Sequence, residues 1–186
     1  MPEIRIHPLA ALAAGLLLYF VDPVVLPLIV WPVACHELGH FVVLRALGCR
    51  ITELDLDLGG LCIRYAGSLG KVGQIAAAAA GPLAGLLYVP AAACFGEAGQ
   101  YSAGISLLLS VFNLLPCLPL DGGRIAAALF GYSFSRRLGI LCACGFTLFG
   151  LWQIAAGSGA AAAVAGLLLL SGLRRYYGSS SAISPD

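Results

Sequence analysis

The sequence predicts an all-α polytopic membrane protein with about six transmembrane helices and a small cytoplasmic β-hairpin between the second and third. Of the 186 residues, 60% are hydrophobic and 10% are charged, which is far from the balance of a soluble domain. Apolar runs close to the roughly 20 residues that one crossing needs recur along the chain. Only one stretch has period two. We therefore expect one membrane-embedded domain, residues 1–186, whose tail, 174–186, is flexible.

The apolar runs divide the chain into six predicted crossings. Met1–His7 lacks the strongly basic start and small-residue cleavage site of a secretory signal, so the first run is expected to stay as a membrane helix. The first and last crossings are short, and only Gly157–Gly159 separates the fifth from the sixth. In order, the predicted crossings are 8–21, 24–47, 71–95, 101–130 with a break inside it, 138–156 and 158–173.

Residues 51–65 alternate in a way that is typical of β-structure. Leucines alternate with acidic residues at 53–58, and Gly59-Gly60 offers a turn before a second short apolar run. The acidic residues could instead form a calcium loop, but the leucines between them and the missing closing glutamate favour the solvated face of a strand. We expect a hairpin that is apolar on one face.

The third and fourth crossings contain unusual small and helix-breaking residues. Gly81 and Gly85 are four residues apart, a spacing that lets membrane helices approach closely, so we assign them a packing role. In the fourth crossing, the segment NLLPCLPLDGGR (113–124) contains two prolines and two adjacent glycines that interrupt a helix. Irregular backbone at membrane depth must be buried in protein or line a wet cavity, so this break predicts such a place.

The charges predict the orientation of the chain. With six crossings, every lysine and arginine falls on or near the side that holds both termini, whereas the other side has Asp22 and Glu97. By the positive-inside rule, we expect a multi-pass protein of the cell membrane with both termini cytoplasmic. A net charge of +1 provides no basic surface, so no nucleic-acid partner is expected. The cysteines of the apolar segments are interpreted as small buried residues, and not as disulfide or metal sites.

The second crossing contains the segment HELGH (36–40). Two histidines four residues apart share one face of a helix, so His36 and His40 can bind the same ion, and Glu37 can approach a water bound to it. The alternative is that these are only polar groups lining the helix. Each ionisable group in a bilayer costs about 2.5–3.5 kcal/mol on insertion scales and persists mainly for function, which favours the metal site.

A catalytic zinc normally has three protein ligands and an open fourth position. The break in the fourth crossing provides a candidate, since Asp121 lies at a depth similar to that of the histidines. The alternative role of Asp121 is a salt bridge with Arg124, three residues later. We expect one zinc ion per chain, bound by His36, His40 and Asp121.

HELGH in one membrane helix and NLLPCLPLDGGR in a later one resemble the site-2 protease family, the intramembrane zinc metalloproteases of peptidase family M50. The resemblance spans a core of residues 24–130, and its LDGGR ending is similar to the sporulation branch, which processes a sigma-factor precursor. It implies that Glu37 is the catalytic acid/base, that Asn113 and Pro119 shape the substrate site, and that the 51–65 hairpin helps hold an unwound substrate. A membrane-associated protein substrate, the lipid bilayer and a regulatory membrane protein are the partners it suggests.

Two other functions fit the same residues. A metal-binding membrane chaperone, or pseudoprotease, would hold clients without cutting them, but the intact Glu37 disfavours it because binding needs no base. A zinc transporter would use the three ligands as a transit site, but the sequence has no internal duplication and no repeated polar helices. The sequence therefore favours a zinc metalloendopeptidase that cleaves near the cytoplasmic face.

Overall fold

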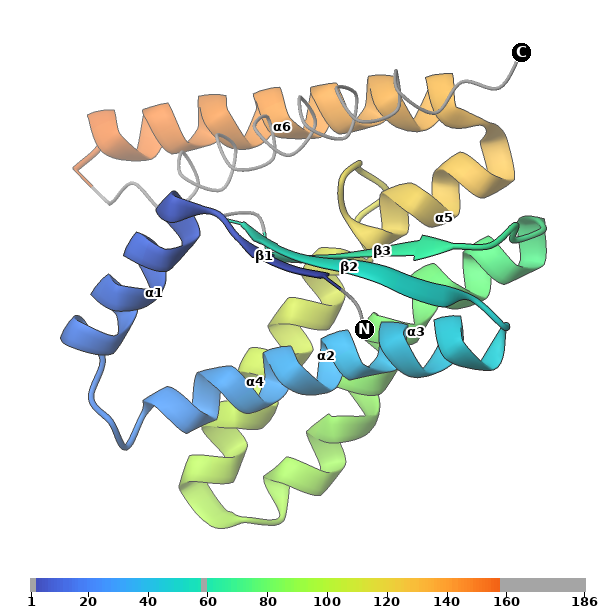
Figure 1. The fold of residues 1–186 in the computed structure, drawn as a ribbon. Coiled ribbons are helices and arrows are strands. Elements are labelled where there is room, and N and C mark those ends of the chain that lie inside the picture. The colour runs from blue at the N-terminus through green and yellow to red at the C-terminus, as the bar shows by residue number, and fades with distance from the viewer. Residues whose placement is uncertain (1–2, 58–59, 158–186) are drawn as a thin grey trace. The chain divides into compact units, whose positions relative to one another are not determined.

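The computed structural model describes residues 3–57 and 60–157, which are mostly helical and include a small sheet (Figure 1). The chain divides into two compact units, Met1–Leu114 and Leu115–Asp186. The described elements are, in order, β1 (Glu3–Ile6), α1 (Pro8–Phe20), α2 (Leu26–Ala46), β2 (Arg50–Asp57), β3 (Gly60–Ala66), α3 (Lys71–Ala93), α4 (Gly96–Asn113), α5 (Asp121–Phe130) and α6 (Tyr132–Ala155).

The sheet of the first unit has three strands in the order β1-β2-β3. β2 and β3 pair antiparallel, which confirms the predicted hairpin, and β1 pairs parallel to β2. The β1 strand was missed by the sequence analysis, which assigned no structure to the residues before the first helix. A strand of four residues gives little local signal, and its parallel partner lies about 50 positions away, so the sequence near β1 does not indicate the pairing.

One face of the sheet is charged and the other is apolar. On the charged face, the Glu53 carboxylate forms ion pairs with Nε of Arg5 at 3.1 Å and with Nε of Arg64 at 3.5 Å. On the apolar face, Leu54 and Ile63 pack against a buried cluster of Leu44, Cys49, Ile51 and Ala77, which come from α2, the α2–β2 turn, β2 and α3. A β-bulge between Ile51 and Glu53 shifts the register, so that Ile51 and Leu54 can both face this cluster.

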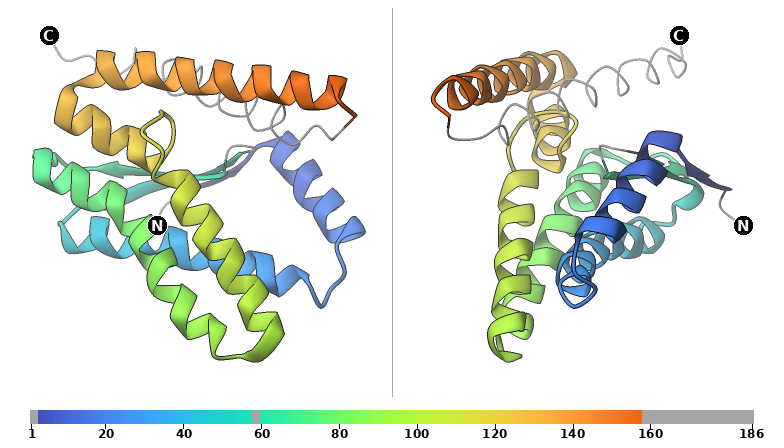
Figure 2. Two further views of the ribbon diagram at one scale, coloured as in Figure 1. Left: turned by 180° about the vertical axis from the view of Figure 1, so that it is seen from behind. Right: turned by 90° about the vertical axis from the view of Figure 1, so that its left-hand side faces the viewer.

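Helices α2, α3 and α4 pack against one another in the first unit (Figure 2). Small residues make this packing close: α3 buries Ala77, Ala80, Gly81 and Gly85, and α4 buries Ser102, Ser106 and Ser110. The Ser106 hydroxyl donates to the Gly85 carbonyl at 2.9 Å. Small side chains and hydroxyl groups at such contacts are typical of helices that associate in a membrane.

The predicted break is present: residues 114–120 form it between α4 and α5. Cys117 and Leu118 of this break are fully buried. This agrees with the rule that irregular backbone at membrane depth is buried in protein or lines a wet cavity. Gly131 alone separates α5 from α6, and its φ of +92° is a conformation that glycine adopts readily. The predicted crossings left residues 131–137 between the fourth and the fifth, whereas α6 already starts at Tyr132.

The predicted crossings correspond to the described helices in most places. Three helices, α2, α3 and α6, are long and apolar enough to cross a membrane by length and composition. α1 is apolar but shorter, and α4 starts at Gly96, ahead of residue 101, where the fourth crossing was predicted to start. The sixth predicted crossing, 158–173, and the tail, 174–186, lie outside the described residues. The chain is thus a helical membrane protein, and six crossings remain a prediction.

Candidate metal centre

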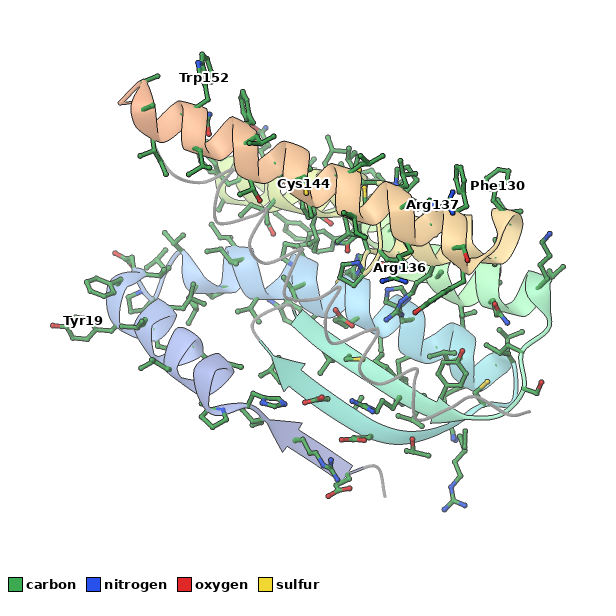
Figure 3. The ribbon with its side chains drawn as sticks, turned by 90° about the horizontal axis from the view of Figure 1, so that it is seen from above. Tyr19, Phe130, Arg136, Arg137, Cys144 and Trp152 are labelled. Atoms are coloured by element: carbon green, nitrogen blue, oxygen red, sulfur yellow. The ribbon has the colours of Figure 1, made fainter. Side chains whose placement is uncertain are left out.

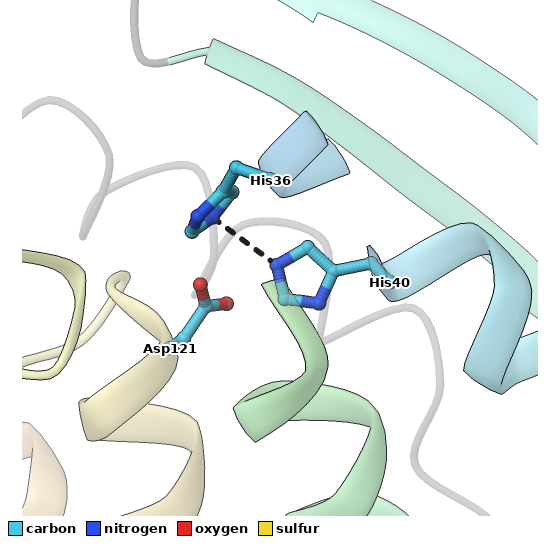
Figure 4. A group of neighbouring side chains, drawn as sticks. All are labelled: His36, His40 and Asp121. Atoms are coloured by element: carbon cyan, nitrogen blue, oxygen red, sulfur yellow. Dashed lines mark hydrogen bonds between the residues drawn. The ribbon is translucent and has the colours of Figure 1, made fainter. Parts of the chain in front are cut away.

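His36 and His40 lie one turn apart on α2, and both are buried, with 4% and 8% of their surface exposed. Their ring centroids are 5.0 Å apart and the ring planes meet at 79°. The two Nε2 atoms are 3.3 Å apart, so these nitrogens, rather than the Nδ1 atoms, face each other (Figure 4). The helix has therefore brought both rings to one point, as the spacing of four predicts.

The hydrogen bond at the other side of the His40 ring fixes its tautomer. Nδ1 of His40 lies 2.8 Å from the carbonyl oxygen of Ala77 on α3. A carbonyl can only accept, so Nδ1 carries the proton and donates it, and Nε2 of the neutral ring keeps its lone pair. This arrangement, with one nitrogen bonded to a backbone carbonyl and the other free to coordinate, is typical of metal-binding histidines.

The spacing of the two Nε2 atoms fits a tetrahedral ion. Two nitrogens that each lie about 2.0–2.1 Å from zinc at a tetrahedral angle are about 3.3–3.4 Å apart. The distance between the Nε2 atoms of His36 and His40 is 3.3 Å. The pair can therefore accept zinc with little movement, and without an ion the same distance suits a hydrogen bond from Nε2–H of His36 to Nε2 of His40.

The close approach of α3 to α2 depends on two glycines. A Cβ at Gly81 would overlap the His40 imidazole at Nε2, and a Cβ at Gly39 would overlap the Ala80 carbonyl and come within 2.7 Å of the Ala84 Cβ. Gly81 had been assigned only to helix packing, together with Gly85. Gly85 does contact α4, at Ser106 and Ser110, but Gly81 makes room for a ligand ring. Gly81 and the Ala77 carbonyl are therefore site residues that spacing rules alone did not identify.

Glu37 and Asp121 differ in their surroundings. Glu37 follows His36 on α2 and is partly buried. Asp121 is the first residue of α5 and is 6% exposed. A carboxylate at a helix N-terminus can accept hydrogen bonds from the unpaired backbone N–H groups of the first turn. The three predicted ligands are thus all buried, His36 and His40 in the first unit and Asp121 in the second.

The two residues predicted to shape the substrate site lie at either end of the break. Asn113 is the last residue of α4, and its Nδ2 donates to the Leu109 carbonyl at 3.0 Å. Its amide oxygen remains an acceptor. Pro119 follows Leu118 through a cis peptide bond, two residues before Asp121. Both residues therefore flank the backbone that leads into α5.

The comparisons with known proteins all find similarity to metalloproteases. The model of peptidase family M50 matches residues 89–142. The chain is 35% identical over 127 residues to the putative zinc metalloprotease sll0528 of Synechocystis, an alignment that covers 60% of this chain and 32% of that protein. It is 32% identical over 121 residues to zinc metalloprotease MJ0392 of Methanocaldococcus jannaschii, covering 57% and 35%. The chain spans about a third of the length of these curated relatives.

A solved structure has the same fold. The site-2 protease from Methanocaldococcus jannaschii aligns with a TM-score of 0.73 and 24% identity, covering 92% of this chain and 89% of that one. This likeness establishes the fold, whereas the family match and the curated relatives carry the sequence relationship. The chain is thus similar to peptidase family M50 over residues 89–142, to two zinc metalloproteases over about 120 residues, and to a site-2 protease in its fold.

Proposed function

We propose that the chain is an intramembrane zinc metalloendopeptidase in which His36, His40 and Asp121 hold the ion and Glu37 is the acid/base. The observation that carries the proposal is the histidine pair: two buried Nε2 atoms 3.3 Å apart, one on a ring whose Nδ1 is bonded to the Ala77 carbonyl. The names of the curated relatives, which are zinc metalloproteases, support the choice of metal and of reaction.

Asp121 is proposed as the third ligand because zinc in a hydrolytic site takes three protein ligands, often two histidines and a carboxylate. Support comes from its burial and from its place at the N-terminus of α5. A bound zinc would supply Lewis-acid activation of a water and of the scissile carbonyl. The ligand set would leave one position open for that chemistry.

The protein's own groups would handle the protons. Glu37 is adjacent to a ligand histidine on α2, so its carboxylate can reach a water held beside the histidine pair, accept the proton and pass it to the leaving amine. The Nδ1–H of His40 stays with the Ala77 carbonyl throughout, which keeps the ring in its coordinating orientation. Burial of both histidines limits bulk water at the site.

The proposed substrate is a membrane-associated protein cut near the cytoplasmic face, with a transcription-factor or sigma-factor precursor as the specific candidate. A peptide must be extended to be cut, and β3 is at an edge of the described three-stranded sheet, where an extended segment could add as a further strand. The free amide oxygen of Asn113 and the rigid ring of Pro119 would shape the entry to the site. A regulatory membrane protein is a proposed further partner.

The proposed orientation keeps both termini in the cytoplasm, and α6 supports it. Its first turns include Arg136 and Arg137, and Trp152 is exposed near its other end (Figure 3). Arginines at the cytoplasmic end and an aromatic side chain at the opposite interface are the usual arrangement for a membrane-crossing helix. Exposed leucines such as Leu141 and Leu148 between them suit contact with lipid.

The deciding experiment compares Glu37→Gln with wild type in lipid nanodiscs containing zinc, with a membrane-anchored reporter protein as substrate. Glu37→Gln should bind zinc like wild type and lose at least about 100-fold in cleavage rate. The matched control is Glu97→Gln, which changes an exposed acid in the first turn of α4 and should cleave normally. Cleavage by Glu37→Gln at the wild-type rate would refute the assignment, and reporter binding without cleavage by wild type would favour the chaperone.

A further inference from the structure

We propose that Ser135 is a positioning residue that fixes the orientation of Asp121. The inference rests on the proposed function and names a residue outside both sequence motifs. Ser135 lies in the first turn of α6 and is fully buried. It is a polar side chain with no part in the proposed chemistry, and its hydroxyl is directed at the backbone of α5.

The contact between Ser135 and α5 is short and specific. The Ser135 hydroxyl lies 2.6 Å from the carbonyl oxygen of Gly123, which can only accept, so the hydroxyl is the donor. Gly123 is two residues after Asp121, within the same first turn of α5. In a helix this carbonyl already accepts from the amide four residues on, and its second lone pair can receive the serine. Ser135 therefore holds the backbone of the turn that bears the carboxylate.

The opposite side of the same turn is held by the break. A Cβ at Gly123 would overlap the backbone of Cys117 and Leu118, which shows that these backbones are in direct contact. The first turn of α5 is thus enclosed between residues 117–118 and Ser135. The Gly131 turn keeps α6 next to α5, and the Ser135 amide donates to the Gly131 carbonyl at 3.3 Å.

A metal ligand is more sensitive to movement of its backbone turn than an ordinary surface residue is. Metal–ligand distances are set to within about 0.2 Å, so a small rotation of the first turn would carry the Asp121 carboxylate out of bonding range. Loss of the Ser135 hydroxyl would remove one of the restraints on that turn. Groups that orient metal ligands typically change metal affinity by about 10–100-fold when they are removed.

The test is the zinc affinity of Ser135→Ala, measured by competition with a chelator on the full chain in detergent micelles. We expect binding about 10-fold weaker than wild type. The matched control is Ser133→Ala, which removes an exposed hydroxyl two residues earlier on the same helix and should leave the affinity unchanged. Ser135→Thr keeps a hydroxyl donor and should restore most of the affinity.

A second measurement separates positioning from stability. The visible spectrum of the cobalt-substituted protein reports ligand geometry, and it should change in Ser135→Ala but not in Ser133→Ala. A merely structural role would lower the melting temperature of the metal-free protein without altering the cobalt spectrum or the zinc affinity, and that result would overturn the proposal. If Ser135→Ala does not fold, Ser135→Cys takes its place, because its thiol is a weak donor and should shift both readouts in the same direction.

The two proposals fail in different ways. Wild-type protein that binds no zinc, or that cleaves equally well as Glu37→Gln, would refute the proposed function whatever Ser135 does. Wild-type protein that binds zinc and cleaves, together with a Ser135→Ala variant of equal zinc affinity and an unchanged cobalt spectrum, would refute only the role of Ser135.

Discussion

The two histidines and Asp121 are held in different ways. His36 and His40 lie within a long regular helix, α2, and one of their rings is oriented by a carbonyl of the neighbouring helix at Ala77. Asp121 begins a short helix directly after an irregular segment, and its turn is restrained by backbone contact with 117–118 and by the Ser135 hydroxyl. The histidines thus owe their spacing to helix geometry, whereas the aspartate owes its place to several tertiary contacts.

This difference indicates where each part of the site is vulnerable. A residue within a long helix keeps its backbone position when a single contact is lost, because the hydrogen bonds of neighbouring turns remain. Only its ring orientation can change. The first turn of a helix lacks intrahelical partners for its amides, so its position depends more on what packs against it. Substitutions around Asp121 should therefore disturb the backbone, and those around His40 should disturb the ring.

The largest effect should come from removing a histidine ligand. His40→Ala should weaken zinc binding by more than about 100-fold, beyond the range seen for groups that only orient ligands. It should also cost about 1 kcal/mol in the metal-free protein, because the bond from Nδ1 to the Ala77 carbonyl is lost. Competition with a chelator and thermal unfolding measure the two effects. His36→Ala is the matched variant for zinc loss, and wild-type affinity in either variant would contradict the ligand assignment.

The second effect concerns the backbone around Asp121. Gly123→Ala places a Cβ against the backbone of Cys117 and Leu118, which cannot be relieved by rotating a side chain. We expect a loss of stability of about 1–3 kcal/mol or more, together with weaker zinc binding. Gly145→Ala on α6 is the control, since a Cβ there meets nothing within 4 Å. Equal unfolding temperatures for the two variants would show that the turn is not enclosed as described.

The third effect isolates the His40 ring. The Cβ of Gly81→Ala would overlap the imidazole at Nε2, but a side chain can rotate away. Zinc affinity should therefore fall by about 10-fold, while the loss of stability should be smaller than in Gly123→Ala. Gly104→Ala, on α4 with nothing within 4 Å of the added Cβ, should be neutral or slightly stabilising. A Gly81→Ala variant that binds zinc normally would mean that the ring does not need this space.

The features that the sequence predicted are those with a local signal. The spacing of His36 and His40 predicted two rings on one helix face, the alternation at 51–65 predicted β2 and β3, and the prolines around Cys117 predicted the break. Each of these signals lies within a few residues of the chain, so it needs no knowledge of what packs against it. The roles of Glu37, Asn113 and Pro119 remain predictions, because they concern chemistry and substrate.

The features that the sequence did not reveal depend on partners far along the chain. β1 pairs with a strand about 50 residues later, the Ala77 carbonyl accepts from a ring 37 residues earlier, and Ser135 of α6 contacts Gly123 of α5. An alanine carbonyl or a single serine has no distinctive pattern before the fold is known. Gly81 was noticed for its spacing from Gly85, but the two glycines face different helices. Their spacing predicted close packing, but only the fold shows which groups each glycine packs against.

The smallest effect should come from the charged face of the sheet, which includes none of the proposed metal ligands. Glu53 accepts ion pairs from Arg5 and Arg64, whose side chains are 59% and 46% exposed. Ion pairs with such exposed partners are screened by solvent, so Glu53→Gln should lower stability by less than about 1 kcal/mol, and by less still in high salt. Zinc affinity should not change. Thermal unfolding at two salt concentrations measures the effect. A large loss of stability that does not depend on salt would contradict this, because it would mean that Glu53 stabilises the protein by packing and not by its exposed ion pairs.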